Sequence, residues 1–452
     1  MIKFYPSFNN ILENFKALSG NQSGILEASC MPVVNFNSDV FLKSITGNMP
    51  DYHKQVFNKD VSMQYHIIGY GSHYEEALIK YTGESIERYS SIMGPTLLKD
   101  KIIYKSYKEL SKNNKVMPLK YIDVFTEKQI KKAKELNVAI CDKKVKEDDI
   151  IGWIKCPSLL NKGEEIYVPA KMMFVGYEED KSKGEMNFIP SFSTGTAAHK
   201  SFKKALLNAL IEYIQIDSFM ITWYTKGKCS LVKIDDENVL KVLEDVNLGE
   251  NSPYEIIPVY MALEECPIHN FGVFLRRKDN KLPYLLFGVQ GGLDASHALT
   301  RGIMEAASIS YGAYFNTIYN KNMLNNVMKD DHKFLDLDSN VLYYSLPSKI
   351  EEKNKLVEEF IENEINLSSL NKLNIEDVDE QIKTLLNYLK NMSEYAVYLD
   401  LTPPETRDKG WYVMRVMIPE LIEMCIPEFP FENHPRMKKY GGVINEHPHP
   451  MP

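Results

Sequence analysis

Residues 193–219 read STGTAAHKSFKKALLNALIEYIQIDSF, and this stretch shows the design from which the fold is built. Gly195 marks a turn, and Ser201 marks the start of a helix because small polar residues favour helix N-termini. Apolar residues then recur at helical spacing, namely Ala205, Leu206, Ala209, Leu210, Tyr213 and Ile214. Asn208 and Glu212 lie four residues apart and share a helix face. We therefore expect a glycine-bearing turn followed by an amphipathic helix that carries a carboxylate.

An earlier stretch, residues 66–90, repeats this design as HIIGYGSHYEEALIKYTGESIERYS. We expect a strand to end at residues 66–68, a turn at Gly69 and Gly71, and a helix capped by Ser72. The spacing places three charged residues on one helix face: Glu84, Glu87 and Arg88.

A later stretch, residues 289–313, repeats it again as VQGGLDASHALTRGIMEAASISYGA. Its pattern predicts a turn at residues 291–292 and a helix capped by Asp294 or Ser296. Two charged residues follow at helical spacing, Arg301 and Glu305.

Between these helices the sequence predicts a mixture of strands and helices. Runs rich in Tyr, Ile and Val predict strands at residues 165–168, 255–259, 284–289 and 413–418. A helix is expected near 127–136, and the charged region 320–395 is typical of exposed helices. The predicted fold class is therefore α+β. We expect residues 1–60 to form an N-terminal extension and residues 61–452 to form one domain, which includes a Pro-rich C-terminus at 443–452.

The composition limits the classes of function. The 452 residues include 44% apolar and 25% charged residues, which are globular proportions, and the formal net charge is −8. A basic nucleic-acid-binding protein is therefore not expected. No run approaches the roughly 20 apolar residues of a membrane helix, and the N-terminus lacks the pattern of a signal peptide, so we expect a cytoplasmic protein with no membrane partner. The six cysteines form no C-x-x-C, which argues against a zinc knuckle.

The residues that bear chemistry are carboxylates on the three amphipathic helices: Glu84, Glu87, Glu212 and Glu305. If the helices pack by their apolar stripes, these groups converge and suit Mg²⁺, which prefers oxygen ligands and bridges to phosphates. Arg88 and Arg301 would pair with phosphate or with the carboxylates. The alternative is a set of surface residues that form weak pairs along each helix, and spacing alone leaves it open. The sequence contains no Walker A, G-x-S-x-G, H-E-x-x-H or complete G-x-G-x-x-G motif.

The chain ends in HPHPMP, with prolines at Pro448, Pro450 and Pro452. Alternating prolines predict a stiff, extended tail that loses little entropy when it docks.

Taken in order, these stretches resemble the YcaO family over roughly residues 60–452. The matching motifs are G-x-G…EEA…GE-x-x-ERYS (69–90), STGTAAH…ALLNALIEYIQIDSF (193–219), GG-x-x-ASHAL-x-RGIMEAA (291–307), DLTPPETRDKGWYVMRVMIPEL (400–421) and the Pro-rich tail. Within the family, the chain is most similar to the azoline-forming "D" proteins of streptolysin S-like toxin clusters, which are sometimes described as docking scaffolds. The resemblance implies a YcaO fold, in which mixed sheets pack against amphipathic helices and the C-terminal tail is extended.

The resemblance also implies an activity, in which ATP and Mg²⁺ drive the cyclodehydration of Cys, Ser or Thr in a ribosomally made precursor peptide. The products would be thiazolines or (methyl)oxazolines, made during maturation of a toxin or bacteriocin. Matched one position at a time, the Mg²⁺ ligands would be Glu84, Glu87, Glu212 and Glu305. The same carboxylates would contact the nucleotide together with Lys80, Arg88, Lys200 and Arg301. The tail would act in catalysis through Pro448, Pro450 and Pro452, with the Pro452 carboxylate delivered near the active site.

This sequence also departs from the family pattern. Gln215 and Ile216 replace an expected Glu-Arg pair, and Lys204 and Lys200 stand where Glu and Asn are common. Lys80 and Tyr70 replace a small polar residue and the Lys of G-K-G. Because Lys204 and Gln215 replace two acidic residues, negative charge is lost near the expected Mg²⁺ ligands, and a degenerate, non-catalytic docking scaffold is the alternative function. A thioamide-forming YcaO is a third, and the Pro-rich tail argues against it.

The resemblance implies protein partners as well. We expect the precursor peptide, an E1-like leader-binding C protein and a flavin-dependent dehydrogenase, the B protein. A homodimer is one possible oligomeric state. The sequence does not identify the precursor peptide, its ring positions or the preference for Cys over Ser and Thr.

Overall fold

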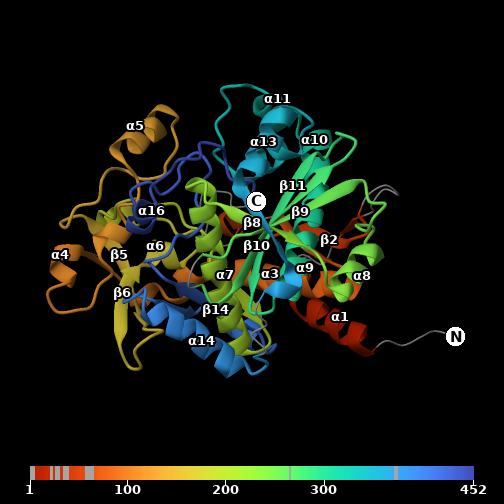
Figure 1. The fold of residues 1–452 in the computed structure, drawn as a ribbon. Helices are drawn as coiled ribbons and strands as arrows, with labels where there is room; N and C mark the ends of the chain where they lie inside the picture. The colour runs from red at the N-terminus through yellow and green to blue at the C-terminus, as the bar shows by residue number, and fades with distance from the viewer. Residues whose placement is uncertain are drawn as a thin grey trace.

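The largest sheet lies between the helices that carry the predicted site residues (Figure 1). The structure is a computed structural model, which describes residues 6–20, 24–25, 31–33, 40–55, 66–263, 266–370 and 375–452. Within these residues the strand order of the sheet is β11–β10–β9–β8–β12, and all neighbours are antiparallel except β8 and β12. The strands are β8 (Cys229–Lys233), β9 (Tyr254–Tyr260), β10 (His269–Arg277), β11 (Leu285–Gly292) and β12 (Ile361–Asn366).

Two long helices cover opposite faces of this sheet because its side chains alternate between faces. Phe287 of β11 packs on Phe219 of α7 (Phe202–Tyr224), with ring centroids 5.2 Å apart. The neighbouring residue Leu286 belongs instead to the core under α9 (Ala295–Ser308). At Gly288 an added Cβ would lie 2.5 Å from a backbone nitrogen of α9, so this glycine permits close helix–sheet packing.

Three smaller sheets complete the described part of the fold, each with three antiparallel strands. The first consists of β13 (Val397–Asp400), β14 (Tyr412–Met417) and β7 (Thr196–His199). The second consists of β4 (Ile102–Ser106), β5 (Ile150–Pro157) and β6 (Glu165–Pro169). The third consists of β1 (Met31–Val33), β2 (Lys43–Asn48) and β3 (His66–Gly71). Helix α7 and helix α3 (Tyr74–Leu97) both lie against β7 and β14. The α+β class is therefore confirmed.

The turn expected at Gly69 and Gly71 is wrong, because both glycines belong to β3 and the turn follows at Ser72 and His73. A Cβ at Gly69 would lie 1.8 Å from the Ala77 carbonyl oxygen of α3. These glycines therefore permit a helix to lie close against the strand, which a sequence pattern does not distinguish from a turn. The expected cap at Ser72 is likewise replaced by His73, which makes no side-chain capping bond.

The described parts of the predicted N-terminal extension lie against the domain. Strand β2 pairs with β3, and Phe15 of α1 (Pro6–Leu18) lies 6.2 Å from the Tyr81 ring of α3. The short helix α2 (Tyr52–Gln55) follows β2. The predicted boundary at residue 60 lies outside the described residues.

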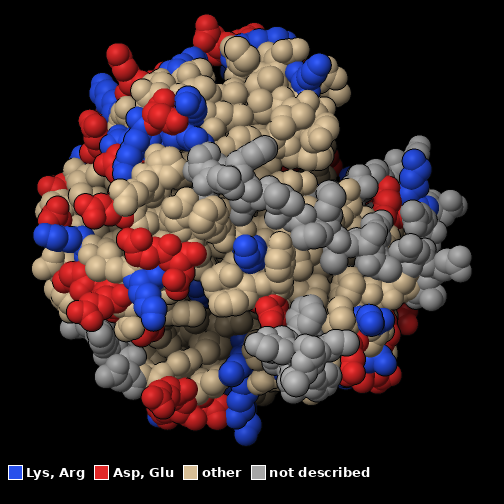
Figure 2. Space-filling model, turned by 90° about the vertical axis from the view of Figure 1, so that its right-hand side faces the viewer, with Lys and Arg blue, Asp and Glu red and all other residues tan. Residues whose placement is uncertain are grey.

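Figure 2 shows acidic and basic side chains interspersed on the face it draws.

The remaining helices surround these sheets. They are α4 (Tyr107–Leu110), α5 (Glu127–Glu135), α6 (Ala170–Met173), α8 (Glu237–Asp245), α10 (Ser310–Tyr319), α11 (Lys321–Val327), α12 (Leu337–Ser345), α13 (Ile350–Phe360), α14 (Val378–Lys390), α15 (Pro404–Arg407) and α16 (Pro435–Lys439). Two expectations for 320–395 are wrong. Helix α12 is largely buried, and residues 361–366 form β12 because they pair with β8 at the edge of the large sheet.

The other elements follow the sequence patterns closely. The four predicted strands correspond to β6, β9, β11 and β14, and the helix near 127–136 corresponds to α5. Four of the five described cysteines are buried, and none of the five forms a disulfide bond. A search of the described helices finds none with the length and apolar character needed to cross a membrane.

Candidate functional site

The first group of site residues comes from one face of α3. Glu84 accepts a hydrogen bond from the Ile68 backbone N–H of β3, at 3.4 Å. Arg88 lies between two carboxylates, with its guanidinium 3.7 Å from Glu84 and 3.3 Å from Glu87. The Glu84 side chain is 29% exposed and that of Glu87 is 17% exposed, so this group is accessible from solvent.

The second contribution comes from α7 and the turn that precedes β7. Gly195 has φ of +80°, a left-handed conformation that favours glycine. Burial raises the pKa of Glu212 to about 7, and hydrogen bonding from the Gly195 backbone opposes this shift. The predicted turn at Gly195 and the helix start at Ser201 are confirmed, since Ser201 is the N-cap of α7.

The third contribution comes from α9, which begins after the predicted cap Asp294. Glu305 accepts a hydrogen bond from the Val289 N–H of β11 at 2.9 Å. Burial raises the pKa of Glu305 to about 7, although hydrogen bonding from Gln290 and Val289 and the Arg301 charge oppose the shift. Arg301 itself lies on the exposed side of α9.

The four predicted carboxylates interact electrostatically one after another, Glu84 with Glu87, Glu87 with Glu212 and Glu212 with Glu305. Burial raises the pKa values of Glu84, Glu87 and Glu212, and the nearby charges of Glu84 and Glu212 raise the pKa of Glu87 further. Glu305 in turn raises the pKa of Glu212, so the group extends from α3 across α7 to α9. These interactions link side chains of three separate helices and are not confined to pairs along one helix.

This donor set fits a divalent cation with bound phosphates. Among the described residues, no three His, Cys, Asp or Glu side chains already lie close enough to enclose a metal ion. Mg²⁺ does not need such a cage, because it usually keeps several waters and is held by one or two carboxylates together with substrate phosphates. Cation binding would also relieve the repulsion among the buried carboxylates.

Lys80 lies at the edge of this group. Its ammonium is 2.8 Å from Glu76 and 4.3 Å from the centroid of the Tyr70 ring. Burial lowers the pKa of Lys80, and the Arg301 charge lowers it further, while Glu305 opposes the shift. Lys80 is therefore within electrostatic reach of both residues predicted on α9.

Lys200 points elsewhere. Its ammonium donates to the Asn14 side chain at 2.7 Å and to the Lys409 carbonyl oxygen at 2.6 Å, and it lies 4.5 Å from the centroid of the Trp411 ring. These contacts direct Lys200 towards α1 and the loop after α15. Lys204 is exposed.

The departures at 215 and 216 are part of the core. Gln215 donates to the Val289 carbonyl oxygen at 2.9 Å and accepts from the Gly291 N–H at 2.7 Å, which joins α7 to β11. Ile216 is buried in the main hydrophobic cluster. Gln215 therefore serves to join α7 to β11 at the position where the family pattern has an acidic residue. The chain keeps the four predicted carboxylates.

The Pro-rich tail docks in a buried position against α7 and α12. Trp223 donates to the His447 carbonyl oxygen at 3.1 Å, and Tyr344 donates to that of Pro448 at 2.7 Å. Asn340 donates to two more tail carbonyls, those of His449 and Met451. The buried tail residues include His449, Pro448 and Pro450, whereas Pro452 is exposed.

The tail approaches the carboxylates along α7. The His449 ring lies 6.1 Å from that of Phe219, which is seven residues after Glu212 on the same helix. Seven residues correspond to about 10 Å along a helix axis.

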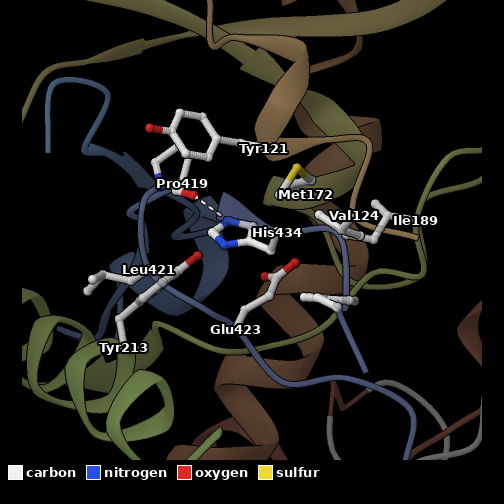
Figure 3. A pocket seen from close by; sticks show the side chains of 10 residues that line it. Tyr121, Val124, Met172, Ile189, Tyr213, Pro419, Leu421, Glu423 and His434 are labelled. Carbon is white, nitrogen blue, oxygen red and sulfur yellow. Dashed lines mark hydrogen bonds between the residues drawn. The ribbon is translucent and has the colours of Figure 1, made fainter. Parts of the chain in front are cut away.

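Two buried charged residues near the site were missed in the sequence. Arg415 of β14 and Glu423 lie 3.8 Å apart, and Arg415 lowers the pKa values of both Glu87 and Glu212. Figure 3 shows the Glu423 carboxylate beside a small cavity lined by Tyr213, Tyr121 and His434. A single Arg within the apolar strand YVMRVM was the available signal for Arg415, whereas Glu423 lies in a loop with no comparable pattern.

The comparisons with known proteins identify the family of this chain. Residues 68–422 match the model of the YcaO family, which is described as a cyclodehydratase that binds ATP and Mg²⁺, so the chain belongs to the YcaO family. ATP and Mg²⁺, the expected cofactors, are thus the cofactors of its family. No curated protein sequence matches the chain.

Several solved structures share the fold at low sequence identity. A heterocyclase in complex with substrate and cofactor is 16% identical with a TM-score of 0.73, and the match covers 98% of this chain and 57% of that one. The chain therefore spans little more than half of that heterocyclase. The YcaO protein from Methanopyrus kandleri, bound with AMPPCP and Mg²⁺, is 14% identical with a TM-score of 0.57, and the match covers 86% and 85% of the two chains. The E. coli microcin synthetase McbBCD complex gives 13% identity, a TM-score of 0.60 and coverage of 89% and 90%.

Proposed function

We propose that this protein is the ATP- and Mg²⁺-dependent cyclodehydratase subunit that converts Cys, Ser or Thr of a ribosomally made precursor peptide into thiazoline or (methyl)oxazoline. We further propose that the product is a streptolysin S-like toxin or a bacteriocin. The observation that carries the proposal is the electrostatic interaction that links Glu84, Glu87, Glu212 and Glu305 across three helices, with Arg88 between two of them.

The chemistry needs a leaving group where the peptide has only an amide oxygen. Bound ATP with Mg²⁺ would supply the phosphoryl group that makes this oxygen leave after the neighbouring thiol or hydroxyl has attacked the carbonyl carbon. In this proposal the four carboxylates bind the cation, and Arg88 and Arg301 contact phosphate oxygens. Lys80, at the edge of the group, is placed to contact the nucleotide, and Lys200 would have to leave Asn14 before it did so.

The docked tail supports a catalytic role for the C-terminus. The hydrogen bonds that Trp223 and Asn340 donate to tail carbonyls hold Pro448 and Pro450 in place and leave Pro452 exposed. We propose that this arrangement presents the Pro452 carboxylate to the peptide, where it assists proton transfer.

A non-catalytic docking scaffold is the alternative that the sequence departures favour. The contacts that Gln215 of α7 makes with β11 and that Lys200 makes with α1 weaken it, because neither side chain neutralises the carboxylates. A catalytic subunit therefore fits the site better than a degenerate one.

We also propose that the enzyme acts within a complex. An E1-like C protein would bind the leader of the precursor peptide, and a flavin-dependent B protein would oxidise azolines to azoles. Support comes from the similarity to the microcin synthetase complex, which was also solved with pro-MccB17 bound.

Mass spectrometry after incubation with ATP, Mg²⁺, a candidate precursor peptide and its partner protein tests the activity directly. We expect the loss of one water per ring, and not the exchange of oxygen for sulfur that thioamide formation gives. Glu84→Ala should abolish ring formation because it removes a proposed Mg²⁺ ligand.

Glu135→Ala, which changes an exposed residue of α5, is the matched control and should form rings normally. Normal ring formation by Glu84→Ala would contradict the proposed site. Partner binding without any measurable nucleotide binding would favour the scaffold instead.

A further inference from the structure

Arg415 is a buried cation that holds a turn at the candidate site. It is 1% exposed, and one guanidinium nitrogen donates to both the Thr194 carbonyl oxygen at 2.5 Å and the Thr196 hydroxyl at 2.9 Å. The other terminal nitrogen donates to the Met172 carbonyl oxygen at 2.6 Å. The guanidinium therefore binds the turn on both sides of Gly195 and ties it to α6.

The turn has little freedom in this position. Gly195 adopts φ of +80°, and its carbonyl oxygen accepts from the Val416 N–H at 2.7 Å. Its own N–H lies close enough to Glu212 to lower the pKa of that carboxyl against the effect of burial. A Cβ at this glycine would lie 2.6 Å from both the Tyr213 ring and the Val416 carbonyl oxygen. The direction of the Gly195 N–H thus depends on the contacts that fix Thr194 and Thr196.

The charge of Arg415 is only partly balanced where it is buried. Its guanidinium lies 3.8 Å from the Glu423 carboxylate, and among the described residues neither the guanidinium Nε nor Glu423 Oε2 has a hydrogen-bond partner. An incompletely paired buried charge is costly, and a residue placed only for stability would be expected to pair more fully. Its three hydrogen bonds instead converge on the segment that carries the Gly195 N–H.

We propose that Arg415 is a positioning residue for the nucleotide and Mg²⁺ site, which holds residues 194–196 so that the Gly195 N–H orients the Glu212 carboxylate. This inference rests on the proposed function in one respect only, namely that Glu212 binds the magnesium–nucleotide complex. Arg415 touches neither ligand and acts through the turn.

Calorimetric binding of AMPPCP in the presence of Mg²⁺ to the full chain tests the inference. Arg415→Lys keeps a positive charge but cannot make the three planar contacts, so we expect the affinity to fall about tenfold, the typical effect of losing charge-assisted hydrogen bonds. Thr196→Val removes a single contact and should weaken binding by a smaller factor. The Mg²⁺ concentration for half-maximal binding should rise in both variants.

Arg436→Lys is the matched control. Arg436 is also a buried arginine, but it pairs with Asp217, five residues further along α7 from Glu212. It should lower the melting temperature while AMPPCP affinity stays within twofold of the unsubstituted protein. Equal losses of affinity in Arg436→Lys and Arg415→Lys would show that any buried arginine has this effect and would overturn the inference.

Glu212→Gln separates this inference from the proposed function. If Glu212→Gln binds AMPPCP and Mg²⁺ normally, the proposed site is wrong and the role of Arg415 falls with it. If Glu212→Gln weakens binding but folded Arg415→Lys does not, only the positioning role is overturned. Should Arg415→Lys fail to fold, Thr196→Val decides, and unchanged affinity in that variant would overturn the inference.

Discussion

At the scale of the residue, Gln215 shows how a departure from a family pattern can serve the fold. Its amide uses both ends, since the nitrogen donates to Val289 and the oxygen accepts from Gly291. A glutamate at this position would supply only acceptors at neutral pH. The family's acidic residue and this glutamine are therefore not interchangeable in this chain.

We expect Gln215→Glu to destabilise the protein by about 1–3 kcal/mol, because a buried carboxylate would face the Val289 carbonyl oxygen without a donor. Thermal unfolding measures the loss. AMPPCP affinity, measured beside it, should not increase. A variant that binds the nucleotide more tightly would mean that the native glutamine had weakened the site.

The residues of the site differ in how far sequence could predict them. Glu84, Glu87, Glu212 and Glu305 were found because helical spacing and the family resemblance point to the same positions. The position of Lys200 depends on its contact with Asn14, which is 186 positions away in the sequence. That of Arg415 depends on Thr196 and Thr194, which are 219 and 221 positions away. No local pattern contains that information.

At the scale of the element, the Pro-rich tail is held mainly by donors to its backbone carbonyls. The contacts come from Trp223, Tyr344 and Asn340 on two different helices. His449 completes the docking, as it is fully buried and bonds through Nε2 to the Cys425 carbonyl oxygen. The sequence predicted a stiff tail, but its partner helices could not be predicted because they follow from the packing of distant elements.

Acid should loosen this tail. Burial lowers the pKa of His449 to about 4, below its ordinary value near 6.5. Between these two values the unfolded state binds more protons than the folded state, so the stability that neutral His449 contributes is lost as pH falls from about 6.5 to 4. Protection factors of the non-proline amides in residues 444–451, which correct exchange for its intrinsic pH dependence, should be lower at pH 5 than at pH 7.5.

His449→Gln provides the comparison, because it keeps an N–H donor and removes the titrating ring. Its tail protection factors should depend less on pH than those of the unsubstituted chain. An identical pH dependence in both proteins would assign the loosening to another group, such as His434, whose pKa burial also lowers to about 4.

The elements themselves were predicted unevenly. Strands β6, β9, β11 and β14 and helices α5 and α7 follow from local apolar patterns. Strand β12 was read as helix because residues 361–366 are charged and follow α13 directly, and only pairing with β8 makes them extended. The glycines of β3 were read as a turn for the same reason, since the close approach of α3 is a tertiary contact.

At the scale of the whole molecule, the carboxylates come from helices that lie in different parts of the fold. Helix α3 packs on β3, α9 covers one face of the large sheet, and α7 covers the other (Figure 1). A ligand that contacts all three would link these layers and would bind the folded state alone.

We therefore expect AMPPCP with Mg²⁺ to raise the melting temperature by a few degrees, since a ligand at a hundred times its dissociation constant stabilises by about 2.7 kcal/mol. AMPPCP with excess chelator should give little shift, because the cation would be absent. Differential scanning calorimetry of the unsubstituted protein and of Glu305→Gln checks this expectation. The same shift in both proteins would remove Glu305 from the site.

Helix α7 is continuous and carries both a carboxylate of the candidate site and the residues that contact the tail. Glu212 lies in the carboxylate group, Gln215 donates a hydrogen bond to β11, and Asp217 pairs with Arg436. Phe219 and Trp223 contact the tail. Inserting or deleting a single residue between 212 and 223 would rotate one end by about 100° against the other and detach one set of contacts. Helix α7 therefore sets a fixed spacing between the two ends of the proposed catalytic machinery, and a change in its length between these points would separate them.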